Sequence, residues 1–491
     1  MPKTTSYYKR LRISRDASQE DIRQAYRKVL LEVHPDVNSE PGATELFLDI
    51  QEAYSVLSDP VARASHDEKS PPEAPPIVQA HPLYSATALR HLDEPQLIYS
   101  LIDIVPTDQS RQSQIELPLH LVLVLDLSTS MKGTRLNTLK AATLDIIQEL
   151  EAEDFISIVT FNDKAEVLFR THNHLEKTQI ESKMMGLMAR GGTEIYRGLE
   201  VGFNEINHRP IPGSVCHIIL ITDGHTYGDE KMCLELAKQA SKLDIGISGF
   251  GIGNEWNDKF LDDIAALTGG QSIYIQNPKQ VKQFLRQKVH RLTKAYAKNV
   301  ILNLNLAPKV TLKSAFRLLP EVSPLPTSSP FSLGPIRHQS PQRILLEFLV
   351  DTIPSTIDNV GLASGEFIIK LQGKEQQVPL TLKRSVVSSK ANLDLPPEVI
   401  LAAMSQLTMY KMQEKAQQEL AQGNHQAAQQ RMKYLATSLL AKEELSLGKA
   451  VLKEATHIKE HHDFSADGQK QIKYGTRKLL LPINQFTEQA P

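Results

Sequence analysis

Leu117-Pro-Leu-His-Leu-Val-Leu-Val-Leu125 runs directly into Asp126-Leu-Ser128-Thr-Ser130. The nearly continuous apolar run predicts a buried strand, so the Asp and the two Ser residues emerge where that strand meets a loop. Farther along, Gly191-Gly-Thr193 supplies another hydroxyl, and the strand-like Ile218-Ile-Leu-Ile-Thr-Asp223 ends in another carboxylate. These side chains offer hard oxygens, which suit Mg²⁺ or Mn²⁺ better than a soft metal. We therefore predict a metal site formed by Asp126, Ser128, Ser130, Thr193 and Asp223.

The surrounding residues 117–296 alternate predicted strands with predicted helices. Strands are expected at 117–125, 155–161, 165–169, 215–222, 245–251 and 271–275, and helices at 136–150, 177–188, 195–206, 230–243, 257–267 and 279–294. Apolar strands between helices predict a mostly parallel sheet covered on both faces, which is the α/β doubly wound class. Ligands of such sheets bind beyond the carboxyl ends of the strands, where Asp126 and Asp223 both lie.

This arrangement of an Asp-x-Ser-x-Ser motif, Thr193 and Asp223 resembles the metal-ion-dependent adhesion site of von Willebrand factor A domains. The resemblance implies that Ser128 and Ser130 ligate the metal through their hydroxyls, and Thr193 directly or through water. It implies that Asp126 and Asp223 bind directly or through ordered waters. It also implies an open metal position that accepts an Asp or Glu carboxylate from a partner protein.

A second motif, His34-Pro35-Asp36, lies between two predicted amphipathic helices. Apolar positions 22, 25, 26, 29, 30 and 33 follow a 3.6-residue period before it, and positions 46, 47, 50, 53, 54 and 57 do so after it. Two antiparallel helices joined by this loop, over residues 4–69, resemble the J-domain of DnaJ-type cochaperones. The resemblance implies that a DnaK-type heat-shock ATPase is bound by the loop and by the basic helix before it, through His34, Pro35, Asp36, Arg23, Arg27 and Lys28.

The remaining segments differ in composition. After a J-domain at 1–69, residues 70–94 are predicted to be a Pro-rich linker, because Ser70 to Pro82 contains five prolines. Strands separated by Pro, Ser and Gly turns predict a β-sandwich at 297–390. The strand-like segment within 95–116 is expected to join that sandwich, so the metal domain would be inserted in it. Residues 391–491 predict a helical tail, either a hairpin or a tetratricopeptide-like pair.

Composition limits the possible functions. A chain of 491 residues is too long for one core. Its net charge of −2, from 55 basic and 57 acidic residues, gives no general drive toward nucleic acid or an anionic membrane. Two cysteines exclude a disulfide framework and favour a reducing compartment. No apolar run reaches the roughly 18 residues of a membrane helix, and no signal peptide is evident, so a cytoplasmic protein is expected.

The leading interpretation is a non-enzymatic cochaperone-like adaptor, in which the J-domain recruits a DnaK-type ATPase and the metal domain binds an unknown protein client. One alternative is a metal-dependent assembly scaffold whose J-domain does not stimulate an ATPase. A third interpretation, of a different class, is a zinc peptidase, because His457-Ile-Lys-Glu460-His461 matches the HxxEH pattern.

Overall fold

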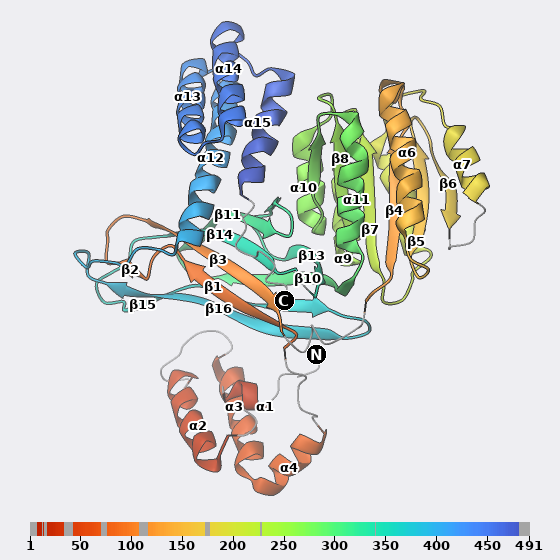
Figure 1. Ribbon diagram of the computed structural model, residues 1–491. Helices are drawn as coiled ribbons and strands as arrows, with labels where there is room; N and C mark the ends of the chain where they lie inside the picture. Colours follow the sequence, from red (N-terminus) through yellow and green to blue (C-terminus); the bar gives the residue numbers. More distant parts are fainter. Residues whose placement is uncertain are drawn as a thin grey trace, which may run out of the picture. The chain divides into compact units, whose positions relative to one another are not determined.

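The structure is a computed structural model that divides into two compact units, Met1–Pro75 and Pro76–Pro491 (Figure 1). It describes residues 7–11, 13, 17–33, 43–69, 76–107, 116–171, 177–225, 228–338 and 340–480. The His34-Pro35-Asp36 motif lies outside the described residues, as does the side chain of Lys28.

The first unit is a small helical domain, as the sequence predicted. Its helices are α1 (Tyr7–Arg10), α2 (Gln19–Val33), α3 (Ala43–Ser58) and α4 (Pro60–Lys69). The apolar stripes of α2 and α3 face each other, and the rings of Tyr26 and Tyr54 stack with centroids 4.0 Å apart. The buried core contains Tyr8, Leu11, Ile22, Val29, Ile50, Ala53 and Leu57. Burial of these side chains removes apolar surface from water, which stabilises the helix pair.

The α/β part of the second unit is a six-stranded sheet with the order β6-β5-β4-β7-β8-β9. All neighbours are parallel except β6, which pairs antiparallel with β5 at one edge. The strands are β4 (Leu119–Asp126), β5 (Phe155–Phe161), β6 (Ala165–Thr171), β7 (Val215–Thr222), β8 (Ile245–Ile252) and β9 (Ser272–Ile275). The prediction of a mostly parallel sheet is therefore confirmed.

Helices cover both faces of this sheet. One apolar layer includes residues of α6 (Thr134–Glu149), α7 (Lys177–Met185) and α11 (Val281–Leu292). The other includes residues of α8 (Ile195–Asn207), α9 (Glu230–Lys242) and α10 (Asp258–Thr268). Two short 3-10 helices, η1 (Thr129–Met131) and η2 (Pro278–Gln280), complete this part of the chain. Strands β4, β7 and β8 are buried along nearly their full length, because each lies between two helical layers.

The β-rich part consists of two five-stranded sheets, in the orders β1-β3-β14-β11-β12 and β13-β10-β15-β16-β2. Their inner faces enclose one apolar core. The strands are β1 (Val78–Tyr84), β2 (Ala88–Arg90), β3 (Gln96–Pro106), β10 (Ala295–Leu306), β11 (Val310–Leu319), β12 (Ser323–Leu325), β13 (Phe331–Arg337), β14 (Gln342–Val350), β15 (Asn359–Lys370) and β16 (Glu375–Val387).

Strand β3 pairs with β14 from Gln96↔Val350 to Ile104↔Gln342, so it is an inner strand of the sandwich. The α/β part leaves the sandwich after β3 and returns through β10. Its two ends lie side by side, because Leu117 N donates to Ala295 O at 2.8 Å. The α/β part is thus inserted between two strands of the sandwich.

The predicted linker at 70–94 was wrong for residues 78–84 and 88–90, which form β1 and β2. Val78 is fully buried, and Pro82 pairs with Ile102 inside β1. Pro82 lacks a donor, but β1 is the last strand of its sheet, and an edge strand tolerates that loss. Proline content therefore marked an edge strand rather than a spacer. Residues 70–75 lie outside the described part of the chain.

The tail contains α12 (Glu398–Ala421), α13 (His425–Ala441), α14 (Leu445–His461) and α15 (Ala466–Leu479). The prediction of a hairpin or pair missed α15. This helix lies against the α/β part, where Arg477 forms two hydrogen bonds with the Asp262 carboxylate at 2.7 and 2.6 Å. Lys473 lies 2.8 Å from the same carboxylate. Burial opposes ionisation of Asp262, but the charges of Arg477 and Lys473 outweigh it and hold the pKa of Asp262 below its ordinary value.

Replacing Asp262 with Asn should destabilise the second unit, because Lys473 and Arg477 would stay buried without a carboxylate. Breaking a buried charge pair costs about 3–5 kcal/mol. We expect Asp262→Asn to lower the free energy of unfolding by about that amount in urea denaturation of the full chain.

Asp263→Asn is the matched control. Asp263 also lies on α10, but its partner Lys259 is 82% exposed and their contact is 2.7 Å. Such surface pairs contribute about 0.2–1 kcal/mol. Equal losses for the two variants would refute a special role for Asp262.

Candidate functional site

Asp126 and Asp223 meet at the carboxyl edge of the parallel sheet. Asp126 is the last residue of β4, and Asp223 follows the last residue of β7. The two strands are parallel neighbours with Leu125 opposite Ile221, so both chains leave the sheet at the same edge. Both Asp residues are fully buried. Two carboxylates from separate strands are therefore held close to one another.

Hydrogen bonds link four of the five predicted ligands in a continuous chain. Asp126 Oδ1 accepts from Ser128 N at 2.7 Å. Ser128 Oγ and Ser130 Oγ are 3.0 Å apart, and Ser130 Oγ donates to Asp223 Oδ1 at 2.6 Å. The second oxygen of Asp126 accepts from Thr222 Oγ1 at 2.6 Å. The motif therefore folds into a compact turn that joins the two strand ends.

Thr193 lies next to this chain, in the loop before α8. It is buried, and a Cβ added to Gly224 would lie 3.1 Å from Thr193 Oγ1. The loop is bound to the motif by Gly191, whose carbonyl accepts from Thr129 N at 3.1 Å and Thr129 Oγ1 at 3.0 Å. All five predicted residues thus lie at one edge of the sheet.

The sequence analysis missed two contributors to this site. Thr222 ends the quoted strand, but its hydroxyl gave no separate signal. Arg135 contacts the Asp223 carboxylate through Nη1 and also donates to Ser130 O at 3.2 Å. It comes from the first turn of α6, soon after the motif. No residue pattern marks an Arg at that position as a partner of Asp223.

Burial governs the electrostatics of Asp126. Desolvation raises its pKa to about 6, and the nearby charge of Asp223 acts in the same direction. Hydrogen bonds from Ser128 and Thr222 oppose the rise without cancelling it. A buried carboxylate of this kind gains from a bound cation.

The donors fit a hard divalent cation. Two carboxylates and three hydroxyls supply only oxygen, and Mg²⁺ commonly takes few protein ligands while keeping several waters. Among the described residues, no group of three or more His, Cys, Asp or Glu side chains is placed to hold a metal. A site for a soft metal, which needs Cys or His, is accordingly not found there.

The HxxEH segment does not assemble into such a site either. The rings of His457 and His461 lie with centroids 4.4 Å apart at the end of α14. However, His457 Nδ1 lies 3.1 Å from the carbonyl oxygen of Asp463. This part of the chain is described, and its side chains do not form a zinc-ligand group.

In the first unit, α2 presents basic side chains to solvent. Arg23 is 57% exposed and lies 3.9 Å from Glu20, a contact too long and too exposed to hold it firmly. Arg27 is one turn farther along and is also exposed. Buried Ile22 and Val29 lie on the opposite side of the helix. The two Arg side chains are therefore available to a partner.

Family models match three segments of the chain. Residues 6–67 match the DnaJ domain, and residues 120–287 match the von Willebrand factor type A domain. Residues 398–482 match the Sll0103-like, C-terminal alpha-helical domain. The chain thus carries a J-domain and a von Willebrand factor A domain, as the motifs predicted, followed by a helical domain that the sequence analysis described only as a hairpin or pair.

Individual relatives agree with these matches. The uncharacterized protein sll0103 of Synechocystis is 28% identical over 379 residues, covering 74% of this chain and 89% of the relative. The chaperone protein DnaJ of Methanosarcina thermophila is 57% identical over 67 residues, which are 14% of this chain and 17% of that protein.

Two solved structures show the fold of the larger unit. A von Willebrand factor type A protein from Catenulispora acidiphila has a TM-score of 0.65 at 16% identity and covers 82% of this chain and 97% of its own. The ArnB paralog VWA2 from Sulfolobus acidocaldarius has a TM-score of 0.52 at 15% identity, with coverage of 82% and 98%. Neither unit contains, among its described helices, one long and apolar enough to cross a lipid bilayer.

Removing the Thr222 hydroxyl should destabilise the site. In Thr222→Val, Asp126 Oδ2 would stay buried without its donor, and an unsatisfied buried group costs about 1–3 kcal/mol. We expect the free energy of unfolding to fall by that amount in urea denaturation with chelator present.

Thr129→Val provides the comparison, because its hydroxyl also donates one bond, to Gly191 O, but from an exposed position. The free energy of unfolding of Thr129→Val should differ from that of wild type by less than about 1 kcal/mol. If Thr222→Val were as stable as wild type, the hydroxyl would not support Asp126.

Proposed function

We propose that this protein is an adaptor that brings a DnaK-type chaperone to a protein partner held through a metal ion. The observation that carries the proposal is the hydrogen-bonded chain from Asp126 to Asp223 at the carboxyl edge of the sheet. The J-domain on the same polypeptide supplies the link to the chaperone. Both matched domain families are typically non-enzymatic adaptors, which supports a binding role rather than catalysis.

The metal would be Mg²⁺ or Mn²⁺. The hydroxyls of Ser128 and Ser130 would hold it, with Thr193 acting directly or through water. Asp126 and Asp223 would supply the negative charge, directly or through ordered waters. A metal held by mostly neutral ligands keeps enough positive charge to attract a partner's Asp or Glu carboxylate.

The J-domain would engage the chaperone through the His34-Pro35-Asp36 loop and the basic residues of α2. Exposed Arg23 and Arg27 support this role, since their contacts within the chain leave them accessible to an acidic surface. Lys28 belongs to the same proposed face. Attraction between opposite charges on two surfaces accelerates association, and added salt weakens this attraction.

Replacing His34 with Gln should abolish stimulation of ATP hydrolysis by the DnaK-type protein of the same organism. Arg23→Ala and Arg27→Ala should weaken stimulation, with a smaller difference from wild type at high salt because exposed charges are screened. Steady-state ATPase rates with the full chain measure both effects.

His81→Gln makes the same chemical change at an exposed position of β1, outside the J-domain, and should leave stimulation intact. If wild-type protein gives no stimulation at any salt concentration, the cochaperone role fails. A metal-dependent assembly scaffold would then remain.

Replacing Asp126 with Ala should abolish binding of Mg²⁺ and Mn²⁺ in calorimetry, because one of two carboxylates is lost. In wild-type protein, metal should raise the midpoint of thermal unfolding by mass action, and chelator should reverse the rise. ATPase stimulation should be unchanged in Asp126→Ala.

Asp263→Ala removes an exposed carboxylate on α10 and should bind metal like wild type. Metal binding that persists unchanged in Asp126→Ala would rule out the site. Partners captured with Mg²⁺ should be released by chelator from wild type and should not be captured by Asp126→Ala.

A further inference from the structure

A cavity of about 250 Å³ lies where the α/β part, the sandwich and the helical tail meet. Its walls come from β9, α11, the turn between β11 and β12, and α15. It is lined by Gln271, Ser272, Ile273, Tyr274, Phe284, Gln287, Lys288, Arg291, Pro320, Glu321, Val322, Tyr474, Arg477 and Lys478. None of these residues belongs to the metal site or to the J-domain.

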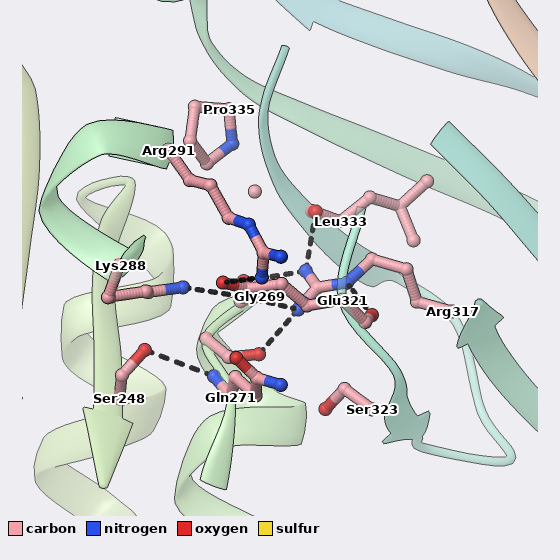
Figure 2. A network of polar contacts seen from close by, with 12 residues as sticks. Ser248, Gly269, Gln271, Lys288, Arg291, Arg317, Glu321, Ser323, Leu333 and Pro335 are labelled. Carbon is pink, nitrogen blue, oxygen red and sulfur yellow. Dashed lines mark hydrogen bonds and ion pairs between the residues drawn. The ribbon is translucent and has the colours of Figure 1, made fainter. Parts of the chain in front are cut away.

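At one wall, three cations surround a single carboxylate, and two of them line the cavity (Figure 2). Glu321 is buried and accepts from Lys288 Nζ at 2.7 Å and from Arg291 Nη1 at 3.0 Å. The guanidinium of Arg317 lies 4.0 Å from the same carboxylate. Burial opposes ionisation of Glu321, but these cations lower its pKa to about 2. On the wall itself Glu321 therefore serves two lining bases, Lys288 and Arg291. Arg317 is not a lining residue, and its guanidinium also donates to the backbone carbonyls of Gly269, Gly270 and Leu333.

On the α15 side, the cavity is lined by Arg477, which is buried and paired with an acid. Arg477 and Lys473 share Asp262, and Lys473 also contacts Asp258. Glu414 is the remaining acid close to these bases, and burial raises its pKa. Arg477 Nε is buried and has no hydrogen-bond partner among the described residues. Among the described residues that line the cavity there is one acid, Glu321, and there are four bases, Lys288, Arg291, Arg477 and Lys478. One buried donor, Arg477 Nε, is unsatisfied within the described part of the chain.

Apolar and aromatic side chains form much of the remaining lining, together with Gln271, Ser272, Gln287 and Lys478. The rings of Tyr274 and Tyr474 lie with centroids 5.8 Å apart. Phe284 faces Lys478, whose Nζ is 5.8 Å from the ring centroid. Such rings pack favourably against another flat ring.

We propose that this cavity binds a small aryl anion, an aromatic ring that carries one carboxylate or phosphate group. Arg477 has its own acid in Asp262, so the lining bases Lys288, Arg291 and Lys478 share the single lining acid Glu321. An anion in the cavity would compensate the remaining positive charge. Arg and Lys bind carboxylate and phosphate through strong charge-assisted hydrogen bonds. A cavity of roughly 150 Å³ already holds benzene, so the larger volume here accommodates a ring with its anionic group. The ligand would contact all three parts of the second unit and stabilise their assembly.

Calorimetry on the full chain at low salt tests the proposal with benzoate and phenyl phosphate, each compared with neutral benzamide and with inorganic phosphate. We expect saturable binding of at least one aryl anion at one site per chain, and much weaker binding of benzamide and inorganic phosphate. Comparison of the two aryl anions distinguishes a carboxylate from a phosphate ligand. Equal binding of benzamide, equal binding of inorganic phosphate, or no saturable binding of either aryl anion at millimolar concentration would overturn the proposal.

Variants locate the binding. Arg291→Met should weaken it roughly tenfold or more, since a charge-assisted hydrogen bond is lost. Arg286→Met is the matched control, because Arg286 lies on the same helix, is half exposed, and pairs with Glu149 outside the cavity. Gln287→Trp keeps every charge and should block the cavity from its exposed rim.

Thermal unfolding of each variant without ligand establishes that the fold is intact. Equal weakening by Arg286→Met and Arg291→Met would show that binding occurs elsewhere. If Gln287→Trp and Arg291→Met each bound the aryl anion as tightly as wild type, this would also show that binding occurs elsewhere.

Discussion

The pairing of β3 with β14 is the constraint on which the larger unit depends. Strand β3, which precedes the von Willebrand factor A domain, becomes an inner strand of the sandwich through this pairing. Strand β10, which follows that domain, is an inner strand of the second sheet of the sandwich. The bond from Leu117 N to Ala295 O then holds both ends of the inserted domain together. Because the two connections are strands of the two sheets of the sandwich, the inserted domain is tethered to the sandwich at two points.

Buried charge makes the same junction specific. Apolar contact alone would tolerate several docking angles, whereas the bidentate contact of Arg477 with Asp262 requires one orientation of α15. Glu321 plays the equivalent part between the sandwich and α11, through Lys288 and Arg291. Burying these ions carries a desolvation cost that the paired geometry must offset, so the contacts serve orientation as much as stability.

The proposed metal site illustrates a different use of burial. Asp126 and Asp223 are removed from water at an edge where the sheet ends, and neutral hydroxyls connect them. Among the described residues, Arg135 forms an ion pair with Asp223. A divalent cation would serve both acids, and this is the physical basis of the metal-dependent capture that we propose. The chaperone binding that we propose for the J-domain (residues 6–67) needs no contact with this site.

Much of this protein could be predicted from its sequence, because the decisive signals are local. The apolar runs of β4 and β7 indicate buried strands, and parallel neighbours end at the same edge, so the sequence alone placed Asp126 and Asp223 together. The 3.6-residue stripes of α2 and α3 likewise predicted the helix pair of the J-domain.

Tertiary structure alone decided the elements whose burial depends on distant partners. In the sequence, Pro82 resembles part of a linker. In the structure, Pro82 lies in β1, which pairs with β3 as an edge strand. Helix α15 carries Lys470, Lys473 and Arg477, a pattern typical of a solvated face, yet all three are buried. A charged side chain is buried only where an opposite charge or carbonyl oxygens receive it, and Asp262 lies 215 residues from Arg477. No local pattern in the sequence records that pairing.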